Sequence, residues 1–206
     1  MIIGFLGAGQ MAQTLAPVWL RAGHRVLLAN SRGPASLADL VATLGPAASA
    51  VTPPELAGAD VVVLATRWDQ LPKALAGVGP LTGKVVVDAT NNFVDDKLVD
   101  IGPRGSSEVV AELVPGARLV KAFNHLLIRR LGTLHDHAEP LALYLAGDDP
   151  AAKAVVAGLI RDLGGVPVDT GRLVEGARRW AAGGVLSGHD HPLTGTEAEA
   201  LLAGHG

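Results

Sequence analysis

The side chains that could transfer a proton or bind a metal are few in this sequence. Lys121 and His125 stand at the end of an apolar run, and either could give a proton to a carbonyl or an imine. The plainer interpretations are a lysine with its ammonium in solvent and a histidine that packs or caps a helix. His189, Asp190 and His191 have the residue types of a metal site, but catalytic zinc needs three fixed protein ligands, and such residues in a polar, Gly-containing tail are usually solvated. The sequence therefore predicts no metal site.

The composition excludes several classes of function. Of the 206 residues, 49% are hydrophobic and 18% are charged, which suits a chain with a sizeable buried core. The net charge of -3 argues against nucleic-acid binding, and no apolar run reaches the roughly 18 residues that a membrane-spanning helix needs. The chain has no Cys and no evident signal peptide, so we expect a cytoplasmic protein that works without disulfides or thiolates.

The first twelve residues, MIIGFLGAGQMA, hold the pattern around which the chain is organised. A short apolar run is followed by the G-x-G-x-x-A form of the dinucleotide-binding turn. Gly7 permits the tight turn, Gly9 lets a pyrophosphate approach the backbone, and Ala12 lets the helix lie close on the strand. The helix start then offers free N–H groups to the phosphates. A plain structural turn is the alternative, but the strand before it and the helix after it favour dinucleotide binding.

Strand-like and helix-like segments alternate along the chain. The predicted strands cover residues 2–6, 25–29, 50–51, 60–65, 84–89, 118–122, 141–146 and 166–169, with segments of helical spacing between most of them. This alternation predicts an α/β fold with a Rossmann-type doubly wound parallel sheet and a small C-terminal extension, whose ligand binds at the carboxyl ends of the strands. Pro17 predicts a kink or an early stop in the first helix, and Asp149 with Pro150 predicts the capped start of a later helix.

The residues after the second predicted strand indicate which cofactor is bound. NAD-binding folds place an Asp or Glu there for the ribose hydroxyls, whereas this chain has Asn30, Ser31 and Arg32. A carboxylate that would repel a 2′-phosphate is missing, and a hydroxyl and a guanidinium that can bind one are present. The alternative is an ordinary solvated turn. We expect NADP(H) as the cofactor.

Several longer segments resemble one family of enzymes. They are GFLGAGQMA, NSRGP, VLATRW, SSEVVAELVPGARLVKAFN, LAGDDPAAKAVVAGLIRDLG and PVDTGRL. Through about Trp180, the chain resembles the NADPH:coenzyme F420 oxidoreductase family of Rossmann enzymes. The segments NNF and ELVPGARLVKAFN also resemble the cytosolic reductase domain of six-transmembrane metalloreductases, which pass a hydride from NADPH to a flavin. Both resemblances imply an NADPH-dependent oxidoreductase.

The resemblance also implies roles for the residues that match. The cofactor-binding set is Gly7, Ala8, Gly9, Gln10 and Met11 at the pyrophosphate, Asn30, Ser31 and Arg32 at the 2′-phosphate, Ala65, Thr66, Arg67 and Trp68 at the nicotinamide ribose, and Asn91 and Asn92 facing the nicotinamide or the acceptor. Residues 121–124 would close the pocket from the other side. Asn124, His125 and Lys121 are therefore the candidate catalytic residues.

The hydride acceptor is the open question, because two features depart from the family. The F420 enzymes tend to carry His-Thr where this chain has Asn124 and His125, and their longer apolar C-terminal region is replaced here by SGHDHPLTGTEAEALLAGHG. The leading interpretation is hydride transfer between NADPH and coenzyme F420, FMN or FAD, which needs orientation more than an acid or base. The alternatives are an NADPH-dependent reductase of a small carbonyl, imine or quinone, and a non-catalytic NADPH-binding or sensing protein.

These expectations divide the chain into three parts. Residues 1–125 form the NADP-binding Rossmann domain, residues 126–186 form a small α/β extension that completes the acceptor site, and residues 187–206 form a polar, mobile tail. The expected partner is a small-molecule hydride acceptor. A homodimer is a further expectation, since Trp180 and the many alanines of the extension could be buried between two subunits.

Overall fold

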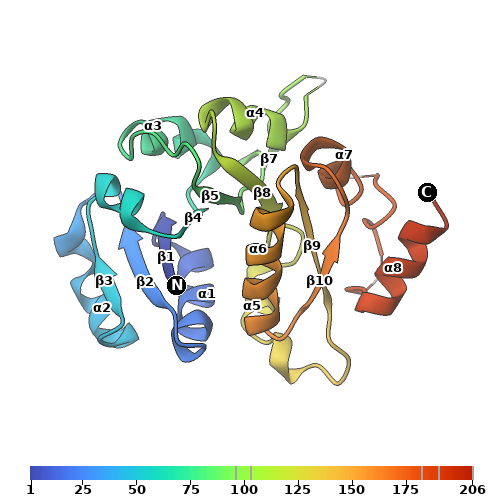
Figure 1. The fold of residues 1–206 in the computed structure, drawn as a ribbon, viewed down its shortest axis with the longest axis horizontal. Helices are drawn as coiled ribbons and strands as arrows, with labels where there is room; N and C mark the ends of the chain where they lie inside the picture. The colour runs from blue at the N-terminus through green and yellow to red at the C-terminus, as the bar shows by residue number, and fades with distance from the viewer. Residues whose placement is uncertain (96, 103, 182, 190, 206) are drawn as a thin grey trace.

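An eight-stranded sheet forms the centre of the protein (Figure 1). The structure is a computed structural model and describes residues 1–95, 97–102, 104–181, 183–189 and 191–205. The strand order is β10-β9-β8-β5-β4-β1-β2-β3. The strands are β1 (Ile2–Leu6), β2 (Arg25–Ala29), β3 (Ala48–Ala50), β4 (Val61–Leu64), β5 (Val85–Asp88), β8 (Arg118–Ala122), β9 (Ala142–Gly147) and β10 (Val166–Asp169). A separate antiparallel pair, β6 (Phe93–Val94) and β7 (Lys97–Leu98), follows β5.

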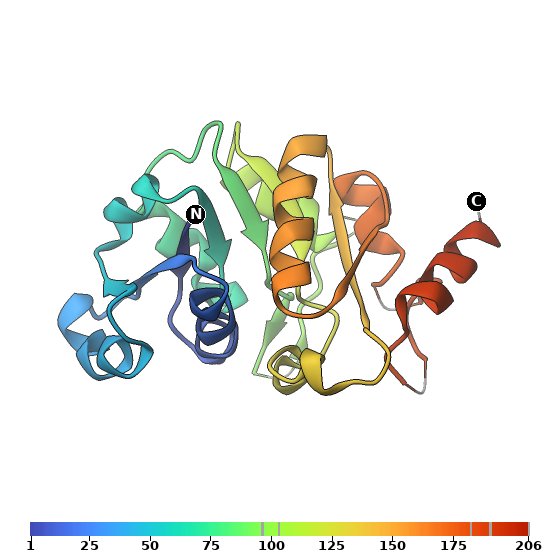
Figure 2. The same cartoon turned by 60° about the horizontal axis from the view of Figure 1, so that its bottom comes forward.

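Each face of the sheet is covered by its own helices, because successive residues of a strand point to opposite faces. In β1, Ile3 and Phe5 belong to one core cluster and Leu6 to the other. The first face is covered by α1 (Gln10–Arg21), α2 (Ala38–Leu44), α5 (Ile128–Leu131) and α6 (Pro150–Asp162), and the second by α3 (Leu71–Ala76), α4 (Ser106–Leu113) and α7 (Leu173–Arg178) (Figure 2). Short 3-10 turns are η1 (Pro34–Leu37), η2 (Pro53–Gly58), η3 (Trp68–Gln70) and η4 (Leu134–Asp136). This is the predicted α/β fold of Rossmann type.

The sheet is not wholly parallel, which corrects the sequence prediction at one edge. The strands from β3 to β8 run parallel, β9 runs antiparallel to β8, and β10 runs parallel to β9. The chain between β8 and β9 holds only the short helices α5 and η4, and it stays at the edge of the sheet where β8 ends. Without a long crossover, β9 can only return antiparallel.

The first helix also departs from its prediction. Helix α1 continues through Pro17 to Arg21, so the early stop is wrong, whereas the alternative of a kink at Pro17 stays a prediction. Four residues adjacent to the proline, Leu15, Ala16, Val18 and Trp19, are buried in the core. Their packing outweighs the one backbone donor that Pro17 lacks.

Residues 187–206, expected to be a mobile tail, contain a helix. This helix, α8 (Gly195–Ala203), packs on β9 and β10 at the outer end of the sheet (Figure 2). Thr194 caps it by accepting a hydrogen bond from the Glu197 backbone N–H at 3.3 Å, and the Glu197 carboxylate accepts one from the Thr194 N–H at 2.8 Å. This reciprocal pair is a capping box. No helix in the described part of the chain is both long and apolar enough to cross a bilayer.

The topology places a binding edge at the ends of the central strands. Strands β2 and β3 lie on one side of β1, and β4, β5 and β8 lie on its other side. The direction in which successive strands are added to the sheet therefore reverses between β1 and β4. Ligands of open α/β sheets bind at such a reversal, outside the carboxyl ends of the strands. The same edge carries the start of β9, because β9 runs antiparallel to β8.

Candidate functional site

The glycine turn between β1 and α1 has two different physical requirements. Gly7 has φ +108°, and a Cβ atom there would lie 2.5 Å from the Ala65 carbonyl oxygen, so this position must be Gly for the strands to pack. Gly9 has φ -81°, and nothing lies within 4 Å of its Cβ position. Gly9 is also the N-cap of α1, and no side chain caps the helix. Open space above uncapped N–H groups is a cradle that a phosphate can fill and a side chain would block.

The loop after β2 is shaped by its own asparagine. The Asn30 side-chain oxygen accepts a hydrogen bond from the Arg32 backbone N–H at 2.9 Å, and the Asn30 amide donates to the Ser36 hydroxyl at 3.0 Å. The Ser31 and Arg32 side chains are exposed, and Arg32 has no ion pair within the residues that the structure describes. Asn30 therefore fixes the loop, while Ser31 and Arg32 remain available to an anion.

A cavity of about 340 Å³ lies at the ends of β1, β4, β5 and β8. It is lined by Gly9, Gln10, Met11, Ala65, Thr66, Arg67, Trp68, Ala89, Thr90, Asn91, Phe93, Phe123, Asn124, Leu126 and Ile128. At its rim, the Arg67 guanidinium donates to Asp69 and to Asp95, each at 3.1 Å. These two carboxylates raise the pKa of Arg67, the Asp69 hydrogen bond contributing most. We call this space the strand-end cavity.

Two asparagines join opposite walls of the strand-end cavity. The Asn91 amide donates to the Asn124 carbonyl at 2.9 Å, and the Asn124 amide donates to the Asn91 side-chain oxygen at 2.9 Å. Phe123 precedes Asn124 with φ +67°, and its buried ring packs edge-on against Trp19 at 5.7 Å. This left-handed turn is rare for a large side chain, and the buried ring and the amide pair on either side hold it.

Lys121 does not face the cavity. Its ammonium lies 2.8 Å from the Asp88 carboxylate and donates to the Thr90 carbonyl at 2.6 Å. Lys121 is 2% exposed and Asp88 0%. Neither of the two interpretations made from the sequence, a solvent-exposed ammonium or a proton donor in the pocket, matches this buried ion pair.

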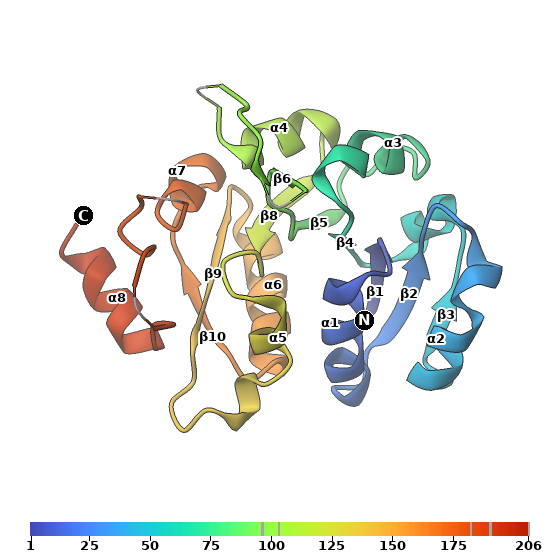
Figure 3. The same ribbon diagram turned by 180° about the vertical axis from the view of Figure 1, so that it is seen from behind.

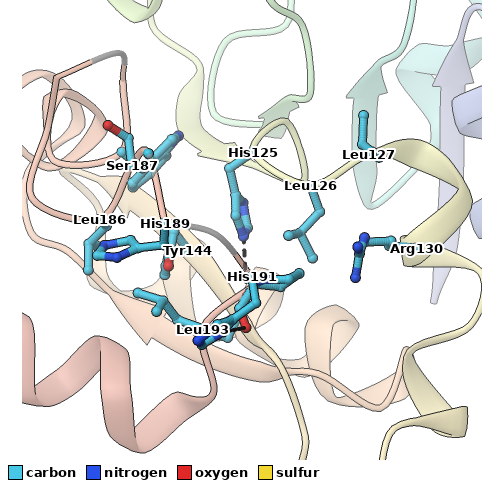
Figure 4. A pocket seen from close by; sticks show the side chains of 14 residues that line it. His125, Leu126, Leu127, Arg130, Tyr144, Leu186, Ser187, His189, His191 and Leu193 are labelled. Carbon is cyan, nitrogen blue, oxygen red and sulfur yellow. Dashed lines mark hydrogen bonds between the residues drawn. The ribbon is translucent and has the colours of Figure 1, made fainter.

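His125 lines a different cavity, of about 300 Å³ (Figure 4). Its ring stacks on Tyr144 at 4.2 Å, its Nε2 lies 3.2 Å from the Ala142 carbonyl oxygen, and its buried Nδ1 has no partner in the described structure. Burial lowers the pKa of His125 to about 4, the Ala142 hydrogen bond opposing this weakly, so the imidazole is neutral near pH 7. Since a carbonyl only accepts, Nε2 carries the proton and Nδ1 is an acceptor. Burial also raises the pKa of Tyr144 to about 12.

The second cavity adjoins the first and is built mainly by the C-terminal third of the chain. Its walls include Tyr144 and Trp180, whose rings lie 5.7 Å apart, and Arg130 stands at one side (Figure 4). Leu126 lines both cavities. The Trp180 indole N–H donates to the Asn124 side-chain oxygen at 3.3 Å, so Asn124 contacts both walls. We call this space the aromatic cavity.

The structure brings together part of the predicted set. Gly9, Gln10, Met11, Ala65, Thr66, Arg67, Trp68, Asn91 and Asn124 line one cavity. Asn92 points elsewhere, since its amide donates to the Val99 carbonyl at 2.8 Å. His189 and His191 line the aromatic cavity, while Asp190 lies outside the described residues. Within the described ranges no group of three potential metal ligands is found.

Some lining residues were not among the site residues that the sequence predicts. Phe93, Leu126 and Ile128 line the strand-end cavity, and Tyr144 and Trp180 line the aromatic one. Phe93 could have been suspected from the sequence because it directly follows Asn91 and Asn92, and in the structure its ring is 49% exposed. The other residues are ordinary apolar or aromatic positions in the sequence, and only the fold brings them to the cavities.

Known proteins share both the sequence and this arrangement. A model of the family described as NADP oxidoreductase, coenzyme F420-dependent, matches residues 2–92. A putative F420-dependent NADP-reductase from Arthrobacter sp. FB24 is 26% identical with a TM-score of 0.71, covering 85% of this chain and 87% of its own. The similarity to the coenzyme F420-dependent NADP oxidoreductase family therefore covers residues 2–92 in the family model and most of the chain in the Arthrobacter relative. The chain is an NADP-dependent oxidoreductase with a Rossmann-type fold.

Two other relatives extend the comparison within and beyond this family. The hypothetical protein SMa0349 from Sinorhizobium meliloti is 37% identical with a TM-score of 0.81, and the match covers 93% of each chain. Metalloreductase STEAP3 of Rattus norvegicus is 29% identical over 176 residues. That match covers 83% of this chain but 34% of the metalloreductase, so the chain spans about a third of this curated relative.

Proposed function

We propose that this oxidoreductase transfers a hydride between NADPH and a flavin or deazaflavin, with coenzyme F420 as the leading acceptor. The family description and the Arthrobacter relative support F420, and the metalloreductase relative supports a flavin-type acceptor. The bound dinucleotide supplies the hydride, and the acceptor takes it. The chain's own residues bind, orient and exclude water.

The observation that carries this proposal is the chemistry of the strand-end cavity. Its polar lining consists of amides, hydroxyls and the guanidinium of Arg67, which is bonded to Asp69 and Asp95. The two candidate proton donors, Lys121 and His125, do not line it. A neutral His125 with its proton bonded to a carbonyl is a poor acid near pH 7. Hydride transfer between two ring systems needs no such acid, whereas reduction of a carbonyl or imine does.

The cofactor fits the residues at the other end of the site. Gly9 leaves a cradle that a Cβ atom would fill, and the N-terminus of α1 is uncapped, so residues 7–11 would hold the pyrophosphate. Ser31 and Arg32 would bind the 2′-phosphate on the loop that Asn30 shapes. Residues 65–68 would border the nicotinamide ribose, and Asn91 with Asn124 would orient the nicotinamide.

The aromatic cavity supports the assignment of the acceptor side. It opens beside Asn124 and is walled by rings of His125, Tyr144 and Trp180, which suit a flat aromatic molecule. We propose that residues 126–186 complete the acceptor site around the NADP-binding residues 1–125, with residues 187–189 and 191–193 bordering it. A homodimer remains a proposal and does not enter this mechanism.

Oxidation of NADPH and of NADH, followed in parallel against F420, FMN, FAD and a quinone, tests the proposed function. The proposal expects turnover with NADPH and F420, or with NADPH and a flavin. Turnover with the quinone alone, or tight NADPH binding without oxidation by any acceptor, would refute it. A preference for NADH would overturn the roles of Ser31 and Arg32.

A further inference from the structure

A buried ion pair lies next to the strand-end cavity without lining it. Asp88 and Lys121 are paired residues in the register of β5 and β8, so their side chains project side by side on one face of the sheet. The Lys121 Nζ lies 2.8 Å from Asp88 Oδ2, and both side chains are shielded from solvent. Figure 3 shows β5 and β8 adjacent at the centre of the molecule.

Stability alone does not explain this pair. Taking two charges out of water is costly, and an apolar pair of similar size is often equally stable or more so. The polar atoms of the pair serve a third residue, Thr90. Asp88 Oδ1 accepts hydrogen bonds from the Thr90 N–H at 2.9 Å and from its hydroxyl at 2.6 Å, and Lys121 Nζ donates to the Thr90 carbonyl at 2.6 Å. All three polar atoms of Thr90 are thereby fixed.

Thr90 connects this pair to the cavity wall. It lines the strand-end cavity, and the next residue, Asn91, exchanges two hydrogen bonds with Asn124. Asn124 is three residues after Lys121, so the same two strand ends are joined twice. The Asp88–Lys121 pair holds the backbone of Thr90, and the Asn91–Asn124 amide pair lies at the wall of the cavity.

We propose that Asp88 and Lys121 are a positioning pair that sets the geometry of Thr90 and Asn91 on the nicotinamide side of the site. Lys121 acts through Thr90 and is not a catalytic residue. This inference rests on the proposed function only for its kinetic readout. The placement of a bound nicotinamide can be measured without any acceptor.

The test removes both charges together. A single substitution would leave an unpaired buried charge and endanger folding, whereas the double variant Asp88→Leu/Lys121→Met keeps an apolar pair of similar size. The matched control is Lys153→Met/Asp169→Leu, which removes a lysine–aspartate pair of 2.8 Å between α6 and β10. Thermal unfolding shows first whether each variant is folded.

We expect three results for the folded double variant. The dissociation constant for NADPH changes by less than about threefold, because phosphate binding at the ends of β1 and β2 dominates affinity. The fluorescence gain of reduced nicotinamide on binding is reduced, because its ring is less firmly held. With a working acceptor, kcat falls about 10- to 100-fold, as a displacement on the order of 1 Å at a reacting ring does. The control variant keeps wild-type values in all three measurements.

Thr90 variants provide an independent test if the double variant does not fold. Thr90→Val removes the hydroxyl bonded to Asp88 and keeps the side-chain shape, so it should lower kcat and nicotinamide fluorescence, and Thr90→Ser should restore both. A purely structural role predicts that kcat follows thermal stability, without this rescue.

Two results would overturn the inference. The first is wild-type kcat and wild-type nicotinamide fluorescence in the folded variants of Asp88, Lys121 and Thr90. The second is a loss of one limb of the pH–rate profile in the double variant, because that loss would make Lys121 a proton donor. If no acceptor oxidises NADPH, the proposed function fails, and the fluorescence measurement still decides the positioning role.

Discussion

The two glycines of the β1–α1 turn should respond differently to the same substitution. For Gly9→Ala, the added Cβ enters open space at an ordinary backbone conformation. We expect the free energy of unfolding to fall by no more than about 1 kcal/mol, from the poorer N-cap. The methyl group would occupy the phosphate cradle, and the loss of one charge-assisted hydrogen bond, about 1.5–3 kcal/mol, raises the dissociation constant for NADPH about 10- to 150-fold.

Gly7→Ala should instead destabilise the fold. Its Cβ would lie 2.5 Å from the Ala65 carbonyl at φ +108°. Backbone strain of about 1–3 kcal/mol and overpacking of about 1–3 kcal/mol together give roughly 2–6 kcal/mol. For a chain of this size, this lowers Tm by roughly 5–20 °C. Thermal unfolding without nucleotide and NADPH fluorescence titration measure the two effects. Wild-type NADPH affinity in Gly9→Ala, or wild-type Tm in Gly7→Ala, would refute the assignment of the turn.

Three further substitutions test other parts of the structure. Arg32→Gln should weaken NADPH binding about 10- to 100-fold by titration, leaving NADH binding and Tm unchanged, since the guanidinium has no ion pair in the described structure; equal weakening of both cofactors would contradict this. Between its folded pKa of about 4 and the ordinary histidine value of 6.5, His125 binds fewer protons in the folded than in the unfolded state, so stability falls as pH drops through this window, at up to about 1.4 kcal/mol per pH unit. His125→Phe should flatten the dependence of Tm on pH between about 4.5 and 6.5, and an unchanged slope would refute the burial argument. Asp149→Ala removes the N-cap bond of 2.7 Å to the Ala152 N–H and should lower Tm by about 2–4 °C, for a loss of about 1 kcal/mol; an unchanged Tm would show that the cap contributes nothing.

The geometry of the β1–α1 turn could be predicted because its signals are local. The spacing of Gly7, Gly9 and Ala12 predicts a tight turn, open space above the backbone and a helix packed closely on the strand. In the structure, Gly7 has a positive φ, nothing lies near the Cβ position of Gly9, and Ala12 is buried. Asp149 and Pro150 likewise start α6 as predicted, with the Asp149 carboxylate accepting from the Ala152 N–H. In these cases the interacting groups are a few residues apart, so their types and spacing determine the geometry.

The Asp88–Lys121 pair and the aromatic cavity depend on contacts between distant residues, which spacing does not encode. The sequence alone indicates a solvent-exposed or catalytic Lys121, because its partner Asp88 is 33 residues away and contacts it only through the strand register. His125 packs on Tyr144 and near Trp180, again far apart in sequence. By contrast, α8 had a readable signal that was overlooked, since Thr194 and Glu197 have the spacing of a capping box.

Asn124 connects the strand-end cavity with the aromatic cavity, whose walls come from residues far apart in the sequence. Its amide N–H group bonds Asn91 on the cofactor side, and its side-chain oxygen accepts from Trp180, which lies after α7 and outside the residues that the family model matches. One side chain therefore contacts residues of both the strand-end cavity and the aromatic cavity. The Asn124 amide donates to Asn91 and accepts from Trp180 at the same time. A change in packing at Trp180 therefore also alters the hydrogen bond between Asn124 and Asn91.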